Sequence, residues 1–316
     1  MFHTGLDRYL TADINTFTTD VGIKLRKKFC NKLWRKILRL CTARKIIIGQ
    51  YPKLEKDKQY IFVTSHSFDE DVISSLATID RNVYMLQGST TQMLHNPVFL
   101  AVWANGMIYL DRLDKESRRT SIDKMKRVLN AGSSVMLFPE GGYNHSENQL
   151  ICPLFASPWI LSKDLGIEVV PLVSVPDLKG KSIHIRVGEP MNIGQCEKWE
   201  GLAQLRDAMA TLVFDILSEH TELVKRSELQ MTRDDWMESR RQVYESQTWY
   251  ADVWDEEVTY YPGHGVTTPE KSREYVDKVN VSDKNAWIFA DTLVRREEDK
   301  KYNLIEYLRR NVEIVK

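Results

Sequence analysis

A chain of 316 residues is long enough for one large domain, or for one domain with an additional segment. Its hydrophobic and charged fractions, 42% and 28%, are those of an ordinary globular protein and exclude disordered and fibrous classes. The formal net charge is zero, but the charge is unevenly distributed. Residues 22–45 contain ten Lys or Arg and no Asp or Glu, so the rest of the chain holds 34 basic against 44 acidic side chains.

The four cysteines show neither the CxxC spacing of a metal site nor the density of a disulfide framework. Reduced thiols in a cytosolic protein are therefore predicted. The first residues lack the pattern of a secretory signal, and no uncharged run approaches the ~20 residues that a membrane-spanning helix needs. We expect a cytoplasmic protein that is soluble or peripheral on the cytoplasmic face of a membrane.

Residues 22–45 have the pattern of an amphipathic basic helix about 36 Å long. Its apolar stripe is formed by Phe29, Leu33, Ile37 and Cys41, widened by Cys30, Trp34 and Leu38. Such a helix can pack on its own domain with a solvated basic face. The absence of acidic residues and the Trp on the apolar face favour a membrane lipid surface instead, where each basic residue contributes about 1 kcal/mol. A nucleic acid has little need for the apolar stripe, so no nucleic-acid partner is predicted.

Strand and helix patterns then alternate along the chain. Strands are predicted at 45–50, 59–65, 82–88, 107–112, 133–139, 167–175 and 182–188, and helices at 69–79, 95–106, 115–132 and 199–226. This alternation predicts an α/β fold, with a mixed, mostly parallel sheet covered by helices on both faces.

Three parts of the chain are expected from these patterns. Residues 1–45 are the N-terminal region with the membrane-surface helix, and residues 46–229 are the α/β domain. Residues 230–316 are a mainly helical C-terminal extension, rich in aromatic residues and carboxylates, to which the sequence assigns no role.

His66 follows the apolar strand predicted at 59–65, at the edge of the sheet where ligands of α/β proteins bind. Asp71 is five residues further on, which does not place the two side chains on one helix face. They meet only if His66 lies in a turn and Asp71 in the first turn of the next helix. Asp71 would then hold one imidazole nitrogen while the other takes a proton. Taken alone, the stretch favours a helix cap with an incidental histidine.

Two other strand ends carry polar residues. The segment 138–142, Phe-Pro-Glu-Gly-Gly, follows an apolar strand, and its glycines allow the backbone to turn tightly beside a ligand. Arg112 closes the strand predicted at 107–112 and would present a cation to a phosphate, unless it pairs with a neighbouring Asp.

Together these stretches resemble the phospholipid and glycerol acyltransferase family, typified by 1-acyl-glycerol-3-phosphate acyltransferases. Four family blocks are matched in order by residues 66–71, 106–112, 138–141 and 170–172. The resemblance covers roughly residues 45–225.

The resemblance implies transfer of a fatty acyl group from a thioester donor, acyl-CoA or acyl-carrier protein, to a hydroxyl of a lysophospholipid or glycerol-phosphate-type acceptor. His66 would be the general base and Asp71 would orient it. The residues that the resemblance assigns to acceptor binding are Gly106, Arg112, Glu140 and Gly141. It implies no metal and no tightly bound cofactor.

The third block departs from the family pattern, because Tyr143 stands where the family usually has an arginine. The acceptor headgroup is therefore left open between lysophosphatidic acid, a lysophospholipid with a larger headgroup and another hydroxyl compound. Two rival functions use the same fold. One is a thioesterase-like hydrolase, and the other is a non-catalytic membrane-surface binding or scaffold protein.

Overall fold

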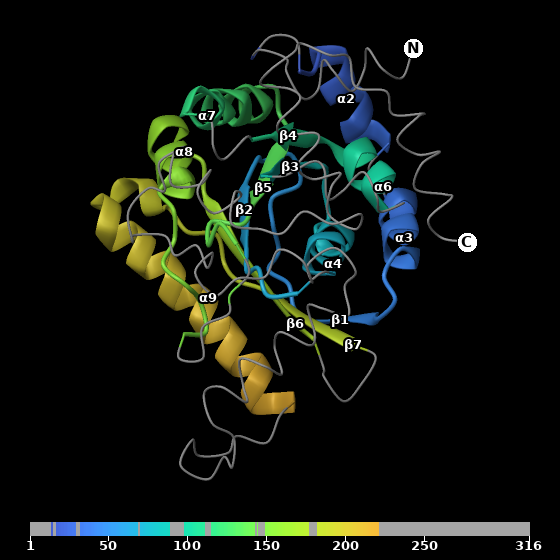
Figure 1. The fold of residues 1–316 in the computed structure, drawn as a ribbon, viewed down its shortest axis with the longest axis vertical. Helices are drawn as coiled ribbons and strands as arrows, with labels where there is room; N and C mark the ends of the chain where they lie inside the picture. The colour runs from blue at the N-terminus through green and yellow to red at the C-terminus, as the bar shows by residue number, and fades with distance from the viewer. Residues whose placement is uncertain are drawn as a thin grey trace, which may run out of the picture.

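The computed structural model describes residue 14 and residues 17–29, 32–68, 70–88, 98–110, 115–142, 144, 149–176 and 182–220. At its centre lies a seven-stranded sheet with the order β1-β7-β6-β2-β5-β3-β4 (Figure 1). The strands are β1 (Lys45–Gln50), β2 (Ile61–Thr64), β3 (Val83–Gln87), β4 (Met107–Tyr109), β5 (Ser134–Leu137), β6 (Val169–Pro176) and β7 (Ser182–Val187). The helices are α2 (Asp20–Phe29), α3 (Lys32–Leu40), α4 (Asp71–Thr78), α6 (Val98–Asn105), α7 (Lys115–Asn130), α8 (Ser157–Leu165), the 3-10 helix η1 (Ile193–Gln195) and α9 (Lys198–His220).

The sheet is mixed and mostly parallel, as predicted. Only the β6–β7 pair is antiparallel among the described strands, so β7 and its parallel neighbour β1 run against the other five. The carboxyl ends of β2, β3, β4, β5 and β6 consequently meet at one edge of the sheet.

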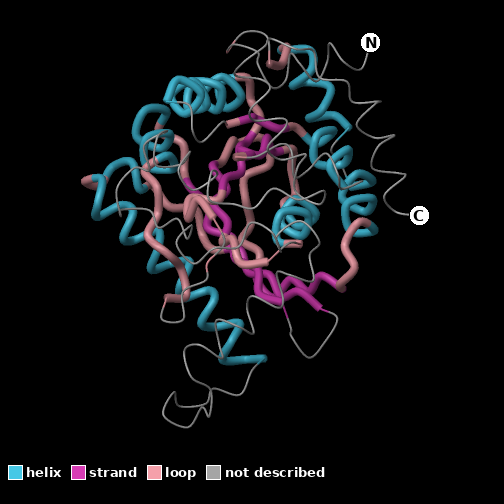
Figure 2. The backbone as a smooth tube through the Cα atoms, viewed as in Figure 1, coloured by secondary structure: helices cyan, strands magenta, loops and turns pink. Residues whose placement is uncertain are grey.

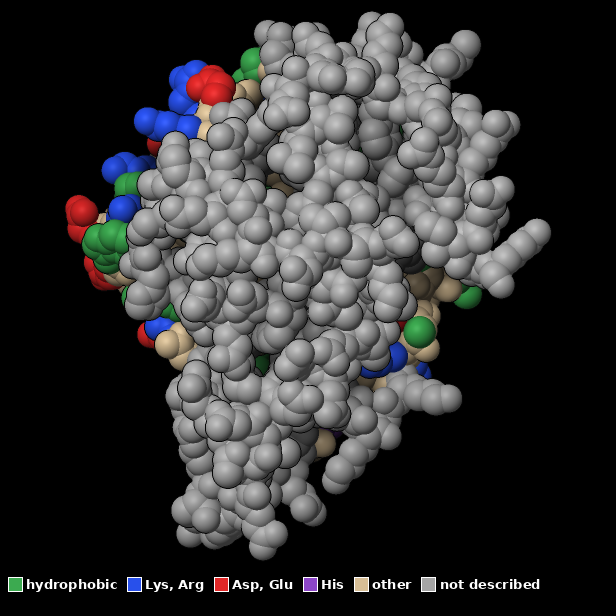
Figure 3. All heavy atoms as spheres, viewed as in Figure 1, with side chains coloured by type: hydrophobic (Ala, Val, Ile, Leu, Met, Phe, Trp, Pro, Cys, Tyr) green, Lys and Arg blue, Asp and Glu red, His purple; other side chains and the backbone are tan. Residues whose placement is uncertain are grey.

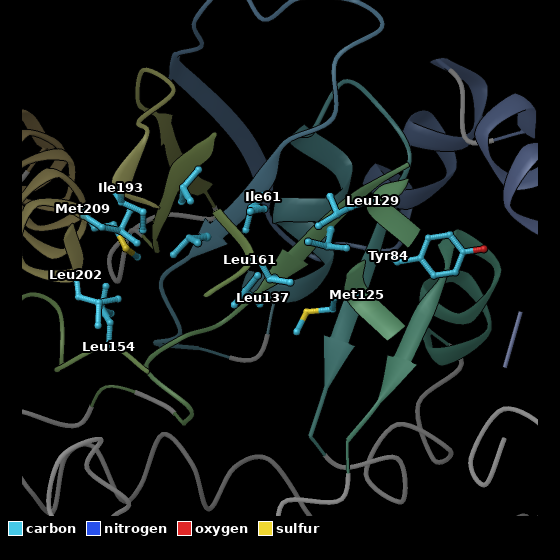
Figure 4. Packing of buried hydrophobic residues seen from close by; sticks show 14 of the residues in the cluster. Ile61, Tyr84, Met125, Leu129, Leu137, Leu154, Leu161, Ile193, Leu202 and Met209 are labelled. Atoms are coloured by element: carbon cyan, nitrogen blue, oxygen red, sulfur yellow. The ribbon is translucent and has the colours of Figure 1, made fainter. Parts of the chain in front are cut away.

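Helices cover both faces of the sheet (Figures 1 and 2). Alternate residues of β2 point to opposite faces, because side chains in a strand alternate with period two. Ile61 and Val63 join the core beneath α7, α8 and α9, part of which is drawn in Figure 4. Tyr60 and Phe62 join a second core beneath α3, α4 and α6. Burial on both faces explains why the central strands are uninterrupted apolar runs.

The N-terminal amphipathic region forms α2 and α3, where the sequence predicted one helix over residues 22–45. Residues 30 and 31 lie outside the described part of the chain. α3 ends at Leu40, five residues earlier than predicted. There the Thr42 hydroxyl donates a hydrogen bond to the Arg39 carbonyl at 2.8 Å and satisfies one of the carbonyls left at the helix end.

One side of α3 packs on the α/β domain. Leu38 is fully buried, and Trp34 Nε1 donates a hydrogen bond to Asn105 Oδ1 at 3.1 Å. On α2, Ile23 is also fully buried. The remaining apolar residues stay exposed in one row on each helix, spaced so that they share a face. These rows are Val21, Leu25 and Phe29 on α2 and Leu33, Ile37 and Leu40 on α3. The predicted stripe therefore divides into a packing side and an exposed side.

The sequence prediction missed α8 and η1. α8 has Pro158 in its first turn and Gly166 directly after its end, which are the expected signals of a helix start and stop. The helix predicted at 199–226 is α9, and residues 221–316, including the predicted C-terminal extension, lie outside the described part.

No helix among the described residues is long and apolar enough to cross a bilayer. Charged side chains of both signs gather along the upper left margin of the molecule in Figure 3, the side on which Figure 1 places α7 and α8.

Two neighbouring residues of α3 test the division of its apolar side chains. We expect Leu38→Ala to lower the free energy of unfolding by about 2–5 kcal/mol, because it empties a fully buried site. Ile37→Ala, at a 40% exposed position, is the matched control and should change it by less than about 1 kcal/mol. Urea unfolding of both variants measures the difference, and equal losses would contradict this packing of α3.

Candidate active site

His66 and Glu140 lie at the same edge of the sheet because each follows one of two paired strands. β2 and β5 are parallel neighbours, with Val63 opposite Leu137. His66 comes three residues after Val63, and Glu140 three residues after Leu137. The Ser65 backbone N–H still donates to the Leu172 carbonyl of β6 at 3.2 Å. His66 is thus the first residue beyond the sheet.

The imidazole of His66 contacts the carboxylate of Asp71. His66 Nδ1 and Asp71 Oδ2 are 2.9 Å apart, and Asp71 begins α4. Asp71 Oδ2 also accepts hydrogen bonds from the backbone N–H groups of Ser67 at 2.8 Å and Phe68 at 3.2 Å. The turn-and-helix geometry that the five-residue spacing required is therefore confirmed.

The burial of Asp71 decides which imidazole nitrogen of His66 carries the proton. The side chain of Asp71 is fully buried, and that of His66 is 16% exposed. A buried carboxylate accepts hydrogen bonds, so Nδ1 of a neutral His66 carries its proton toward Asp71. The basic lone pair is then on Nε2, the nitrogen that Asp71 does not contact. The Phe138 ring packs against the imidazole with a centroid separation of 4.5 Å and limits its rotation.

Glu140 is almost completely buried, with an exposed fraction of 1%. Its Oε1 accepts a hydrogen bond from the His66 backbone N–H at 3.0 Å, and its Oε2 accepts one from the Cys152 backbone N–H at 2.7 Å. Burial raises the pKa of Glu140 from 4.5 to about 7 despite these two donors. Burial also raises the pKa of the Cys152 thiol, to about 12, so this thiol is protonated at neutral pH and is no nucleophile.

Gly141 belongs to the same turn. It has φ of +75°, and a Cβ atom there would lie 2.3 Å from the Phe155 ring. The structure therefore explains this glycine by its backbone conformation and by packing. Substrate contact by Gly141 stays a prediction.

Gly106 lies at the other edge of the sheet. The strand register places it level with Ile61, five residues before His66, or about 16 Å along the strand direction. β4 is also the third strand away from β2. The structure thus brings His66, Asp71, Glu140 and Gly141 together but not Gly106. Arg112 lies outside the described residues.

Sequence reasoning missed the segments that surround His66 from other parts of the chain. The Asn144 backbone N–H donates to the His66 carbonyl at 2.6 Å, and the Phe155 N–H donates to the Pro139 carbonyl at 2.8 Å. Backbone groups make these contacts, so no side-chain motif signals them. The apolar composition of residues 151–155 was the one available sign that this segment packs inside the domain.

The fold and this group of residues define an α/β protein with a histidine–carboxylate pair at the carboxyl ends of parallel strands. The model of the acyltransferase family matches residues 45–175, the part of the chain that holds the four sequence blocks.

A curated relative is the 1-acyl-sn-glycerol-3-phosphate acyltransferase of Chlamydomonas reinhardtii. It is 24% identical over 170 residues, which is 52% of this chain and 50% of the relative. The chain thus spans about half the length of that relative. Among solved structures, the 1-acyl-sn-glycerophosphate acyltransferase PlsC of Thermotoga maritima aligns with a TM-score of 0.46 at 16% identity, over 64% of this chain and 81% of PlsC.

The raised pKa of Glu140 predicts a pH-dependent contribution to stability. Because the pKa is higher in the folded than in the unfolded chain, this contribution is complete below about pH 4.5 and is lost as the pH rises to about 7. Glu140→Gln does not titrate. The unfolding free energy of wild type minus that of the variant should therefore fall between these pH values and stay level above about pH 8. Urea unfolding at a series of pH values measures it, and a difference that rises with pH would contradict the assignment.

Proposed function

We propose that this chain is an O-acyltransferase of phospholipid metabolism. It moves a fatty acyl group from a thioester donor, acyl-CoA or acyl-carrier protein, to a hydroxyl of a lysophospholipid or glycerol-phosphate-type acceptor. The observation that carries the proposal is the 2.9 Å contact between His66 Nδ1 and the buried Asp71 carboxylate, within a domain of the acyltransferase family. The activity named for the Chlamydomonas relative supports the acceptor class.

His66 acts as the general base in this reaction. The acceptor hydroxyl gives its proton to Nε2 while its oxygen forms a bond to the thioester carbonyl carbon. The carbon–sulfur bond then breaks, and the thiolate leaves and takes the proton back from the imidazolium. The adjacent Asp71 carboxylate stabilises the imidazolium between these two transfers. No covalent acyl-enzyme is formed.

The exposed apolar rows of α2 and α3 support contact with a membrane surface. Phe29, Leu33 and Leu40 have exposed fractions of 70%, 67% and 85%. Exposed basic side chains lie on the same helices, at Lys24, Lys27, Lys28, Lys36 and Arg39. Apolar side chains beside Lys and Arg suit the boundary between headgroups and acyl chains of an anionic bilayer. This would place the protein peripherally on the cytoplasmic face, beside its lipid acceptor.

The activity itself is tested with acyl-CoAs and acyl-carrier proteins as donors and lysophospholipids that differ in headgroup as acceptors. We expect thiol release that depends on the acceptor and yields acylated lipid. His66→Ala should lower kcat by about 10²–10⁴-fold, the usual contribution of a general base. Asp71→Asn should lower it less, because the base remains but its charged form loses its partner. Thiol release and lipid products are measured together.

Other outcomes identify the rivals. Thiol release without acceptor would indicate the hydrolase. A His66→Ala variant with unchanged activity would remove His66 from the reaction, and no activity with any donor would leave the scaffold function.

The membrane surface is tested by vesicle binding. We expect the double substitution Leu33→Glu and Ile37→Glu to weaken binding to vesicles with anionic lipid by at least about tenfold, because it places charge where apolar side chains enter the bilayer. Trp199→Ser is the matched control, since Trp199 is 71% exposed on α9 and outside the proposed surface. Binding should also weaken as salt is raised. Equal effects of the two changes would contradict the proposed surface.

A further inference from the structure

We infer that Glu140 is a positioning residue that holds the peptide backbone of His66, and that its carboxylate does not bind the acceptor. The inference rests on the proposed function, in which His66 is the base. It replaces the acceptor-binding role that the family resemblance implied for Glu140.

Glu140 is buried and already bonded to the backbone, which keeps its carboxylate away from an acceptor. Both carboxylate oxygens already accept backbone hydrogen bonds, from His66 at 3.0 Å and from Cys152 at 2.7 Å. The side chain is 99% buried, as its exposed fraction of 1% shows. Charge-assisted hydrogen bonds in a buried setting are among the strong ones. An acceptor hydroxyl would have to enter the interior of the domain to reach either oxygen.

The peptide groups on both sides of the His66 side chain are held by one segment. Glu140 accepts from the His66 N–H, and the Asn144 N–H donates to the His66 carbonyl at 2.6 Å. Both residues follow β5. Asp71 holds the imidazole from α4. The backbone hydrogen bonds thus fix the position of the His66 Cα, and the contact with Asp71 fixes the orientation of the imidazole ring.

Glu140 also connects this segment to a third part of the chain through Cys152. Residues 151–155 run beside the turn at Gly141, where Phe155 N–H donates to the Pro139 carbonyl. Loss of the Glu140 carboxylate therefore releases His66 and the segment that supports it together. Proton transfer needs a donor–acceptor distance of about 2.6–3.2 Å, and a displacement of about 1 Å costs on the order of 100-fold in rate.

The test is Glu140→Gln, which keeps the size of the side chain. Only one of the two acceptor oxygens remains, and an amide NH₂ faces the other backbone N–H. Ser134→Ala is the matched control. Ser134 is buried in β5, and its Oγ accepts a hydrogen bond from the Tyr60 N–H at 3.1 Å, at the opposite edge of the sheet. The Ser134→Ala substitution therefore removes a buried hydrogen-bond acceptor at a site distant from His66. Both variants are measured for unfolding, for kcat and KM of each substrate, and for hydrogen exchange of individual amides.

The expected result for Glu140→Gln is a fall in kcat of about 100-fold, with KM for donor and acceptor within about twofold of wild type. The amides of His66 and Cys152 should exchange faster. Ser134→Ala should lose stability but keep kcat and the protection of these two amides. A raised KM for the acceptor with unchanged kcat would overturn the inference, as would equal losses of kcat in both variants.

Hydrogen exchange separates this inference from the proposed function. If wild type transfers no acyl group, the proposed function fails, yet faster exchange at His66 in Glu140→Gln would still establish the backbone contact. If that variant does not fold, Glu140→Asp, which keeps the carboxylate but shortens the side chain, is measured in the same way. Unchanged protection of the His66 and Cys152 amides in this variant would overturn the inference.

Discussion

The buried carboxylate of Asp71 is the constraint on which the site depends. One of its oxygens accepts hydrogen bonds from the Ser67 and Phe68 N–H groups and contacts His66 Nδ1. Burying a charge is costly unless such partners compensate it, so the turn after β2 and the start of α4 must keep one geometry. The positive end of the helix dipole also favours a carboxylate there. The position of His66 follows from this local arrangement.

The pairing of strands in the sheet brings Glu140 next to the His66–Asp71 pair. Because β2 and β5 are parallel neighbours, the turns that follow them meet, and Glu140 reaches the His66 backbone. The two acidic side chains have different tasks that their partners explain. Asp71 contacts the imidazole, whereas Glu140 accepts hydrogen bonds from the backbone N–H groups of His66 and Cys152. The Asp71 carboxylate stabilises the charged imidazole, and the Glu140 carboxylate holds the backbone of His66 in position.

Much of the domain could be predicted from the sequence because its signals are local. Apolar runs indicated the strands, and the spacing of His66 and Asp71 allowed their contact across a turn and the start of a helix. The partners of Glu140 could not be predicted, because one of them is the backbone of Cys152, which no motif marks. Gly106 belonged to a matching block, and the strand register places it level with Ile61, far from His66. The stripe on α2 and α3 gave no sign of which apolar residues pack, since that depends on where Asn105 and the α/β core lie.

The central claim is that Asp71 prepares His66 as a base at Nε2. Nitrogen-15 NMR of the His66 imidazole tests it most directly, at a pH where the ring is neutral. The account predicts that wild type carries the proton on Nδ1, and that Asp71→Asn shows a mixture of the two tautomers. A wild-type ring protonated on Nε2 would contradict the account, because the nitrogen that must take the acceptor proton would already hold one.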